Sequence, residues 1–189
     1  MENAILREFI MSLQIVDAKK CLLKNEEAMM LAEIETHPKV REYDTDVHTN
    51  NKSEMYRLFK KFLKTLPSNK KQIFLVGKLN GKVIGFLGIY RESKRMKHVG
   101  VVGITVHPDY WNRGFGTNLL EAGIEHARKE GLLKLEADTL AKNKAMLRIA
   151  EKVGFKREGI RKIRIKMGER YEDEALLGMV LASERHATS

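Results

Sequence analysis

Residues 106–117 read Val-His-Pro-Asp-Tyr-Trp-Asn-Arg-Gly-Phe-Gly-Thr, and the fold follows from how this stretch joins its two neighbours. An apolar run typical of a strand ends at Pro108, and a run with helical periodicity begins after Gly116. Glycines at such a junction let a ligand approach the backbone closely. Free N–H groups at a helix N-terminus, with Arg113 beside them, suit a phosphate group. The stretch therefore predicts a phosphate site between a strand and a helix, with glycines that serve only a tight turn as the alternative.

Two better-known phosphate motifs do not fit this stretch. A dinucleotide fingerprint needs a third glycine at the position of Leu119. No Gly-x-x-x-x-Gly-Lys-Ser/Thr sequence occurs anywhere in the chain. The expected anion site is therefore of another kind.

The segments on either side predict a mixed α/β (α+β) domain with a central sheet. Asn80-Gly81 marks a hairpin turn between two runs of strand-forming residues. Pro67 and Gly131 each end a run of helical spacing. In chain order we expect a strand region over 12–24, helices over 26–35 and 53–66, strands over 72–79, 82–90 and 98–106, a helix over 117–130, a strand over 132–139, a helix over 143–152, and strands over 155–166 and 175–181.

Length and composition set the outer limits. The 189 residues, 43% of them hydrophobic, fit one domain over 1–189, with 1–11 as an N-terminal extension and 182–189 as a flexible tail. No run approaches the roughly 20 apolar residues of a membrane span. The first residues also lack the order of a secretory signal. We therefore expect a soluble, cytoplasmic protein with no membrane partner.

The formal net charge of +10 suits an anionic partner, either a nucleic acid or a polyphosphate cofactor. A solvated surface explains the charge as well, because 32% of the residues are charged and the acidic ones are interspersed. No aromatic RNA-binding, helix-turn-helix or zinc-finger pattern occurs, so we expect no nucleic-acid partner. The single cysteine, Cys21, cannot form an internal disulfide, and we expect it to be buried. No Cys/His spacing fits a metal site, so no metal is expected.

Three motifs, in order along the chain, carry a resemblance to a known family. Residues 107–120 (HPDYWNRGFGTNLL) resemble the acetyl-CoA pyrophosphate loop of the GNAT acetyltransferases. Residues 143–155 (NKAMLRIAEKVGF) resemble the helix and strand start that follow this loop, and residues 168–174 (GERYEDE) are similar to a C-terminal motif of the family. The likeness is closest to the Rim-type (ribosomal-protein N-terminal) acetyltransferases and to the small-amine and amino-acid acetyltransferases.

This resemblance implies a central, mixed, mostly antiparallel sheet flanked by helices, in which diverging strands form the acetyl-CoA site. The end of the strand over 98–106 would pair with the pantetheine arm and polarise the thioester carbonyl; its residues are Ile104, Thr105 and Val106. The pyrophosphate would be held by Arg113, Gly114, Phe115, Gly116 and Thr117. Asn143 would contact the cofactor arm, although an ordinary helix N-cap explains this residue too.

The implied activity is acetyl transfer from acetyl-CoA to a primary amine, which can be a protein N-terminus, a lysine or a small molecule. Direct attack in a ternary complex needs a base for the ammonium but no enzyme nucleophile. The chain departs from the family at two places: Ala150 stands where many members carry a proton-donating Tyr, and Val101-Val102 stand where relatives often carry Glu. The remaining candidates are His98 and Asp138 as the base and Tyr171 or Tyr110 as the acid, unless a water serves or no acid is needed.

Two other functions stay open. A non-catalytic acyl-CoA-binding or sensing module would have kept the cofactor loop and lost the chemistry, which the missing Tyr suggests. A nucleic-acid-binding domain is suggested by the net charge alone. The resemblance is compatible with a homodimer, and the sequence does not identify the acceptor amine because the segments expected to contact it carry no specific motif.

Overall fold

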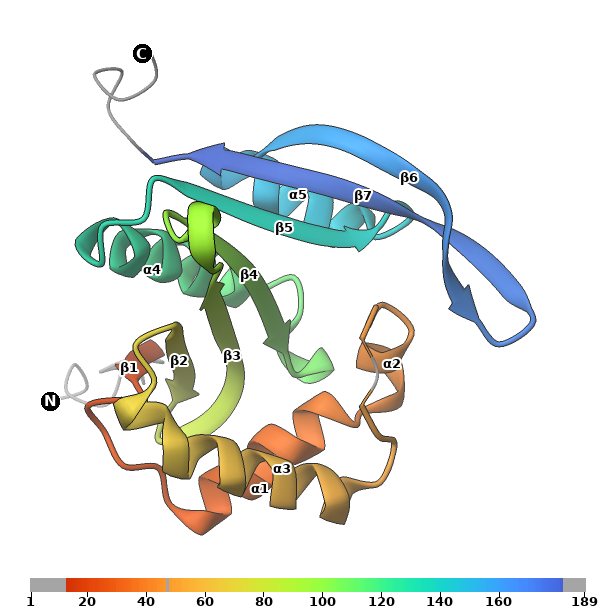
Figure 1. Cartoon of the computed structure of the whole chain (residues 1–189). Helices are drawn as coiled ribbons and strands as arrows, with labels where there is room; N and C mark the ends of the chain where they lie inside the picture. The colour runs from red at the N-terminus through yellow and green to blue at the C-terminus, as the bar shows by residue number, and fades with distance from the viewer. Residues whose placement is uncertain (1–12, 47, 182–189) are drawn as a thin grey trace, which may run out of the picture.

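A seven-stranded sheet runs through the molecule, and helices pack on both of its faces. In the computed structural model, which describes residues 13–46 and 48–181, the strand order is β1-β2-β3-β4-β5-β7-β6 (Figure 1). The strands are β1 Leu13–Asp17, β2 Gln72–Leu79, β3 Lys82–Arg91, β4 Val99–Val106, β5 Lys134–Leu140, β6 Lys156–Met167 and β7 Arg170–Val180. The helices are α1 Asn25–Glu35, α2 Pro38–Arg41, α3 Lys52–Thr65, α4 Phe115–Lys129 and α5 Lys144–Val153. The expected extension over 1–11 and the expected tail over 182–189 lie outside the described residues.

The pairing of the strands confirms the expected mixed, mostly antiparallel sheet. Among the described strands, β4 and β5 pair in parallel, and the other neighbours pair antiparallel. A parallel pair needs a crossover between its strands, and α4 provides it.

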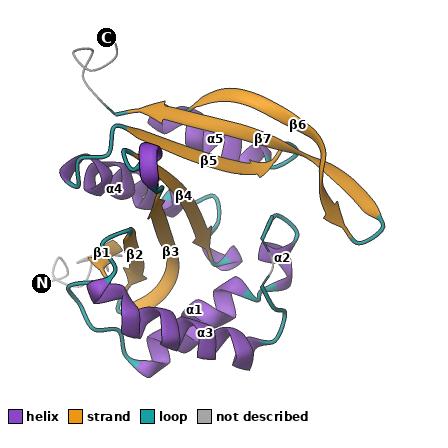
Figure 2. Ribbon diagram, in the orientation of Figure 1, coloured by secondary structure: helices purple, strands orange, loops and turns teal. Residues whose placement is uncertain are grey.

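Helices cover the two faces in pairs (Figure 2). α1 and α3 lie on one face, where Phe59 and Phe62 of α3 pack against Phe74 of β2. α4 and α5 lie on the other face, in a core that includes Leu75 of β2 and Leu135 of β5. Adjacent residues of a strand point to opposite faces, so Phe74 and Leu75 belong to different cores. The sheet therefore separates an α1/α3 side from an α4/α5 side.

β4 and β5 stay together over three residue pairs and then part. Val99, Gly100 and Val101 pair with Lys134, Leu135 and Glu136. Beyond this point β4 continues beside β3 and β5 continues beside β7. The closed end is tightly packed, because a Cβ at Gly100 would lie 2.7 Å from Ile89 Cγ2. The expected divergence of these two strands is thus confirmed.

The N-terminal strand is shorter than the strand region expected over 12–24. Asp17 ends it, because its Oδ1 accepts a hydrogen bond from Lys19 N–H at 3.0 Å and its carbonyl accepts one from Cys21 N–H at 3.0 Å. Such an aspartate turn competes with strand continuation. Cys21 consequently lies exposed, and the expectation that it is buried is wrong.

The C-terminal hairpin is longer than expected. Gly168 adopts a left-handed backbone with φ of +62°, which allows a tight turn directly after Met167. β7 therefore starts at Arg170, five residues before the expected strand start at 175. The hairpin extends past the end of β5 and approaches the region of α2 (Figure 1).

We predict that hydrogen exchange will report the parting of β4 from β5. His107 N–H donates to the Ile84 carbonyl at 2.8 Å, and successive backbone N–H groups point to opposite edges of a strand. The amides of Ile104 and Val106 therefore face away from β3 and should exchange about tenfold or more faster than the amide of Thr105. Equal protection of Ile104 and Thr105, measured by NMR, would show that the edge is not open.

Candidate active site

The outer edge of β4 is open where β5 has left it. The N–H and C=O of Ile104 and the N–H of Val106 face this opening, and no strand of the described residues pairs with them. Unpaired N–H and C=O groups at a strand edge are free to bind a hydrogen-bond partner. The edge is thus suited to an extended ligand arm that binds as an additional strand.

The loop after β4 turns sharply into α4. Asn112 has φ of +59° and Gly114 has φ of +82°, so two left-handed residues flank Arg113. α4 begins at Phe115, and the first N–H groups of a helix have no partner within it. The exposed Arg113 guanidinium lies 5.8 Å from the centre of the Tyr110 ring. This geometry suits an anion, and the anion site expected over 113–117 stays a prediction.

The residues of this loop contribute in different ways. The side chains of Phe115 and Thr117 are buried and point into the protein. A Cβ at Gly116 would lie 3.4 Å from Ile149 of α5, so the glycine lets α4 and α5 approach each other. An anion can therefore meet backbone N–H groups from 115–117 and the charge of Arg113.

Trp111 connects this loop to the strand edge. Its indole N–H donates to the Val106 carbonyl at 2.7 Å, which leaves one lone pair of that oxygen for another donor. Tyr43, in the segment after α2, lies edge-on to the Trp111 ring with 6.3 Å between ring centres. Tyr43 therefore packs against the residue that caps the Val106 carbonyl, a contact that the sequence pattern did not indicate.

Asn143 is the N-cap of α5. Its Oδ1 accepts from Met146 N–H at 3.1 Å, and its Nδ2 donates to the Thr139 hydroxyl at 3.1 Å. These two bonds hold the start of α5 against the end of β5. A contact between Asn143 and a cofactor arm would use the remaining hydrogen-bonding capacity of the amide.

Glu35, the last residue of α1, lies beside β4. The Thr105 hydroxyl donates a hydrogen bond to its carboxylate. Burial and the nearby Asp44 carboxylate raise the pKa of Glu35, while Arg41, His48 and Thr105 act in the opposite direction. The negative end of the α1 dipole adds to the increase. A carboxylate with a raised pKa next to the open strand edge is a candidate general base.

The sequence motifs did not indicate Glu35, although the sequence contains one weak signal for it. A glutamate at the C-terminus of a helix opposes the helix dipole, and such a position is unusual for an acidic residue. The connection to Thr105 depends on two elements far apart in the sequence and could not be foreseen.

Asp138 of β5 lines a pocket on the other side of the opening. The pocket has a volume of about 400 Å³, and its lining includes Thr45, Asp46, Asp138, Arg164, Lys166 and Glu174. Burial and the Glu174 carboxylate raise the pKa of Asp138, and a hydrogen bond from the Thr45 hydroxyl, at 3.5 Å, lowers it. Glu174 is itself buried and paired with Arg161 at 2.9 Å. The pocket is therefore polar, carries both signs of charge, and lies between residues 45–46, β5 and the β6–β7 hairpin.

A second pocket of about 390 Å³ lies between the segment after α2 and the β6–β7 hairpin. Tyr43, Met167 and Arg170 are among its lining residues. The two pockets share no lining residue, but both are bounded by the segment 42–46 and by the hairpin. These two segments therefore form walls of both pockets, and Tyr43 also packs against Trp111 of the loop after β4.

The structure separates three of the catalytic candidates of the sequence analysis. His98 is exposed at the closed end of the β4–β5 pair, where its carbonyl accepts from Leu133 N–H at 2.8 Å. Tyr171 is 60% exposed near the hairpin tip, and its neighbour Glu172 points to the pocket face, so Tyr171 points to the opposite face. These positions argue against His98 as the base and Tyr171 as the acid. Of these three, Asp138 alone lies at the opening.

Ala150 is fully buried in the core between α5 and the sheet. Its methyl side chain offers no hydroxyl group to a substrate. Within residues 13–46 and 48–181, no cluster of His, Cys, Asp or Glu side chains is arranged to hold a metal. None of the described helices is long and apolar enough to cross a membrane.

Comparison with known proteins supplies a family context for this geometry. Residues 30–155 match the model of the Acetyltransferase (GNAT) family. The chain is 27% identical over 113 residues to the uncharacterized N-acetyltransferase MJ1207 of Methanocaldococcus jannaschii, which covers 58% of this chain and 50% of that protein. It is 28% identical over 121 residues to the [ribosomal protein bS18]-alanine N-acetyltransferase of Escherichia coli, which covers 63% of this chain and 80% of that protein. The similarity thus spans only about half of the archaeal relative.

A solved structure shares the fold. The Salmonella typhimurium acetyltransferase yncA, determined with its cofactor acetyl-CoA, superposes with a TM-score of 0.75 at 18% identity. The similarity covers 92% of this chain and 96% of that one. The expected diverging-strand architecture is confirmed by this likeness.

We predict that Arg113→Ala and Gly116→Val will each weaken acetyl-CoA binding. The first removes the charge beside the helix N-terminus, and the second places methyl groups beside its N–H groups. Each should raise the dissociation constant by about tenfold or more, which is about 1.4 kcal/mol. Isothermal calorimetry tests this, with Lys129→Ala at the far end of α4 as the matched control. Wild-type affinity in both loop variants would remove this loop from the binding site.

Proposed function

The chain belongs to the acetyltransferase (GNAT) family, and from this premise we propose that it is an acetyl-CoA-dependent N-acetyltransferase. The reaction joins a primary amine to the acetyl group by direct attack within a ternary complex. The observation that carries the proposal is the juxtaposition of the unpaired edge of β4, the anion-binding loop after it, and the Glu35 carboxylate beside Thr105.

The β4 edge and the loop fit the two ends of acetyl-CoA. The backbone of Ile104 and Val106 offers the hydrogen bonds that the amides of a pantetheine arm require. The N–H groups of 115–117 and Arg113 offer the charge and the donors that a pyrophosphate requires. Asn143, at the start of α5, borders the arm from the side of β5. A backbone N–H of the open edge can also polarise the thioester carbonyl.

Glu35 is proposed as the general base. An amine must lose a proton before it can attack a thioester, and its pKa lies near 8 for an α-amine and near 10.4 for a lysine. Glu35, directly or through one water, takes this proton while the C–N bond forms. The C–S bond then breaks and the thiolate of CoA leaves. Thr105 orients the carboxylate through its hydroxyl.

The departing thiolate needs little help from an acid. A thiol of this kind has a pKa near 8.5, so it leaves readily near neutral pH. This explains how a buried Ala150 is compatible with catalysis. Tyr43, whose ring packs against Trp111 next to this loop, is proposed as the phenol that protonates the thiolate.

Asp138 is proposed to bind the acceptor amine. It lines the pocket that also contains Glu174 and Lys166. Burial and Glu174 raise the pKa of Asp138, and an ammonium group that enters the pocket would favour its ionised form. The acceptor classes proposed are a protein N-terminus, a lysine and a small-molecule amine.

An acceptor panel tests the activity as a whole. CoA release is measured with acetyl-CoA and with peptides, free amino acids, lysine-containing peptides and polyamines. Release that depends on one class supports the proposal and selects the acceptor. Tight acetyl-CoA binding without release for any class would instead favour a non-catalytic acyl-CoA-binding module.

We predict a specific pH dependence for Glu35→Gln. In the wild type, kcat/KM should rise with pH through the raised pKa of Glu35, because the carboxyl can accept a proton only after it ionises. Glu35→Gln should lose this rise, and kcat/KM should fall about 10²- to 10⁴-fold.

Asp138→Asn is the companion variant for the same measurement. It should raise KM for the amine and keep the rise with pH. Loss of the rise in Asp138→Asn, with the rise retained in Glu35→Gln, would assign the base to Asp138 and overturn the role given to Glu35.

A further inference from the structure

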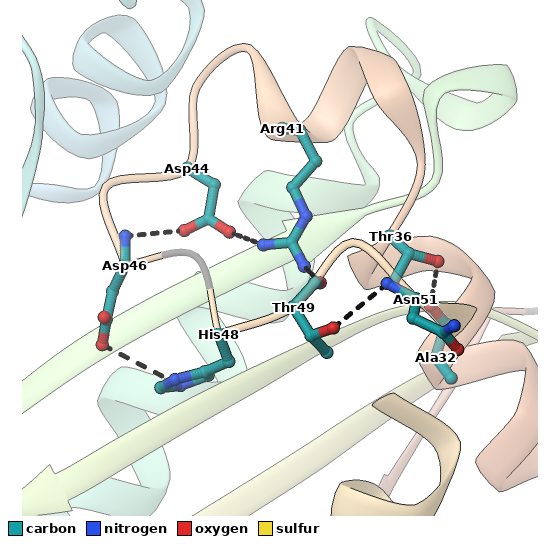
Figure 3. Close-up of polar contacts among 8 residues, drawn as sticks. All are labelled: Ala32, Thr36, Arg41, Asp44, Asp46, His48, Thr49 and Asn51. Carbon is teal, nitrogen blue, oxygen red and sulfur yellow. Dashed lines mark hydrogen bonds and ion pairs between the residues drawn. The ribbon is translucent and has the colours of Figure 1, made fainter. Parts of the chain in front are cut away.

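The side chain of Arg41, the last residue of α2, is largely enclosed by the protein. Its side chain is 11% exposed, and its guanidinium donates through Nη1 to the Asp44 carboxylate and through Nη2 to the Thr49 carbonyl (Figure 3). Its Nε is buried and has no hydrogen-bond partner among the described residues. Burial of a charged group with one unpaired N–H opposes folding. The position of Arg41 is therefore not explained by stability alone.

The two hydrogen bonds of Arg41 connect Asp44 with Thr49, and both of these residues lie in the segment between α2 and α3. Asp44 Oδ1 also accepts a hydrogen bond from Asp46 N–H at 3.0 Å (Figure 3). The adjacent Thr45 reaches β5, where its hydroxyl contacts Asp138. A planar guanidinium holds two acceptors in a fixed relation, which a lysine cannot do. The shape of this segment, and its contact with the acceptor pocket, thus depend on Arg41.

Asp44 and Arg41 also lie near the proposed base. The charged groups that act on Glu35 are Asp44, Arg41 and His48, and the polar group is the Thr105 hydroxyl of β4. The Asp44 carboxylate disfavours the ionised form of Glu35, and the Arg41 guanidinium favours it. Within the Arg41–Asp44 ion pair these two influences on Glu35 oppose each other, and that of Asp44 is the larger.

We propose that Arg41 is a positioning residue that holds Asp44 and Thr49 in a fixed relation and counters the Asp44 charge beside Glu35. This inference rests on the proposed function, in which Glu35 is the general base. Arg41 and Asp44 affect the reaction through Glu35 and through the residues around Asp44, and they contact neither the amine nor acetyl-CoA.

Two variants that remove opposite charges test how Arg41 and Asp44 affect Glu35. Arg41→Gln removes the cation, so the rise of kcat/KM with pH should move to higher pH. Asp44→Asn removes the anion, so the rise should move to lower pH. The double variant should lie between the two. Arg57→Gln, on the exposed face of α3, is the matched control and should keep the wild-type profile.

Arg41→Lys separates charge from shape. The lysine keeps the positive charge, so the pH profile should stay close to that of the wild type. It loses the two-way bond to Asp44 and Thr49, so KM for the amine should rise about tenfold, as expected when one charged hydrogen bond is lost. If Arg41→Gln does not fold, Arg41→Lys still tests the two hydrogen bonds of the arginine. Asp44→Asn then tests the charge effect on Glu35 through its pH profile.

The outcomes separate this inference from the proposed function. The inference is supported if the rise is absent in Glu35→Gln and moves in opposite directions in Arg41→Gln and Asp44→Asn. If Glu35→Gln loses the rise but the Arg41 and Asp44 variants change only KM or the melting temperature, the inference about Arg41 is overturned and the proposed role of Glu35 stands. If Glu35→Gln keeps the rise, the role of Glu35 as base fails, and the role of Arg41 fails with it.

Discussion

The structure depends on one backbone constraint, which is that β4 and β5 share hydrogen bonds over three residue pairs and then separate. Gly100 allows the tight packing at the closed end, and the pairing of β5 with β7 draws the strands apart. The backbone groups of Ile104 and Val106 are left without a strand partner among the described residues. Because β4 and β5 run parallel, the starts of α4 and α5 come to the same open end. The ligand-binding features are consequences of this separation.

Charge at the site differs from charge over the whole chain. The chain carries a formal +10, yet the walls of the opening include the carboxylates of Glu35, Asp44, Asp138 and Glu174. Arginine side chains stand behind two of them, Arg41 with Asp44 and Arg161 with Glu174. A net charge therefore says little about which acceptor fits. The local arrangement allows an ammonium group to enter although the molecule is basic.

The proposed site has a cofactor half, formed by one continuous stretch of the chain, and an acceptor half, formed by residues from several elements. The cofactor half consists of one continuous stretch, from the end of β4 through the loop to α4, so its geometry is local. The acceptor half joins α1, the segment after α2, β5 and the C-terminal hairpin. Its residues meet only because the sheet brings them together. The acceptor half can thus vary without disturbing the loop at 107–117, which explains how one fold serves different amines.

The sequence by itself determined the order of the elements, the anion-binding loop and the family. These features rest on short-range patterns: Asn80-Gly81 fixes a hairpin, and Pro108 with Gly114 and Gly116 fixes a strand–loop–helix junction. Only the tertiary structure decided which titratable groups face the opening. It places His98 at the closed end of the β4–β5 pair and Tyr171 on the exposed face of the hairpin, and it places Glu35 beside Thr105. The physical reason is that burial and through-space charge set these roles, and both depend on contacts between residues that are far apart in the chain.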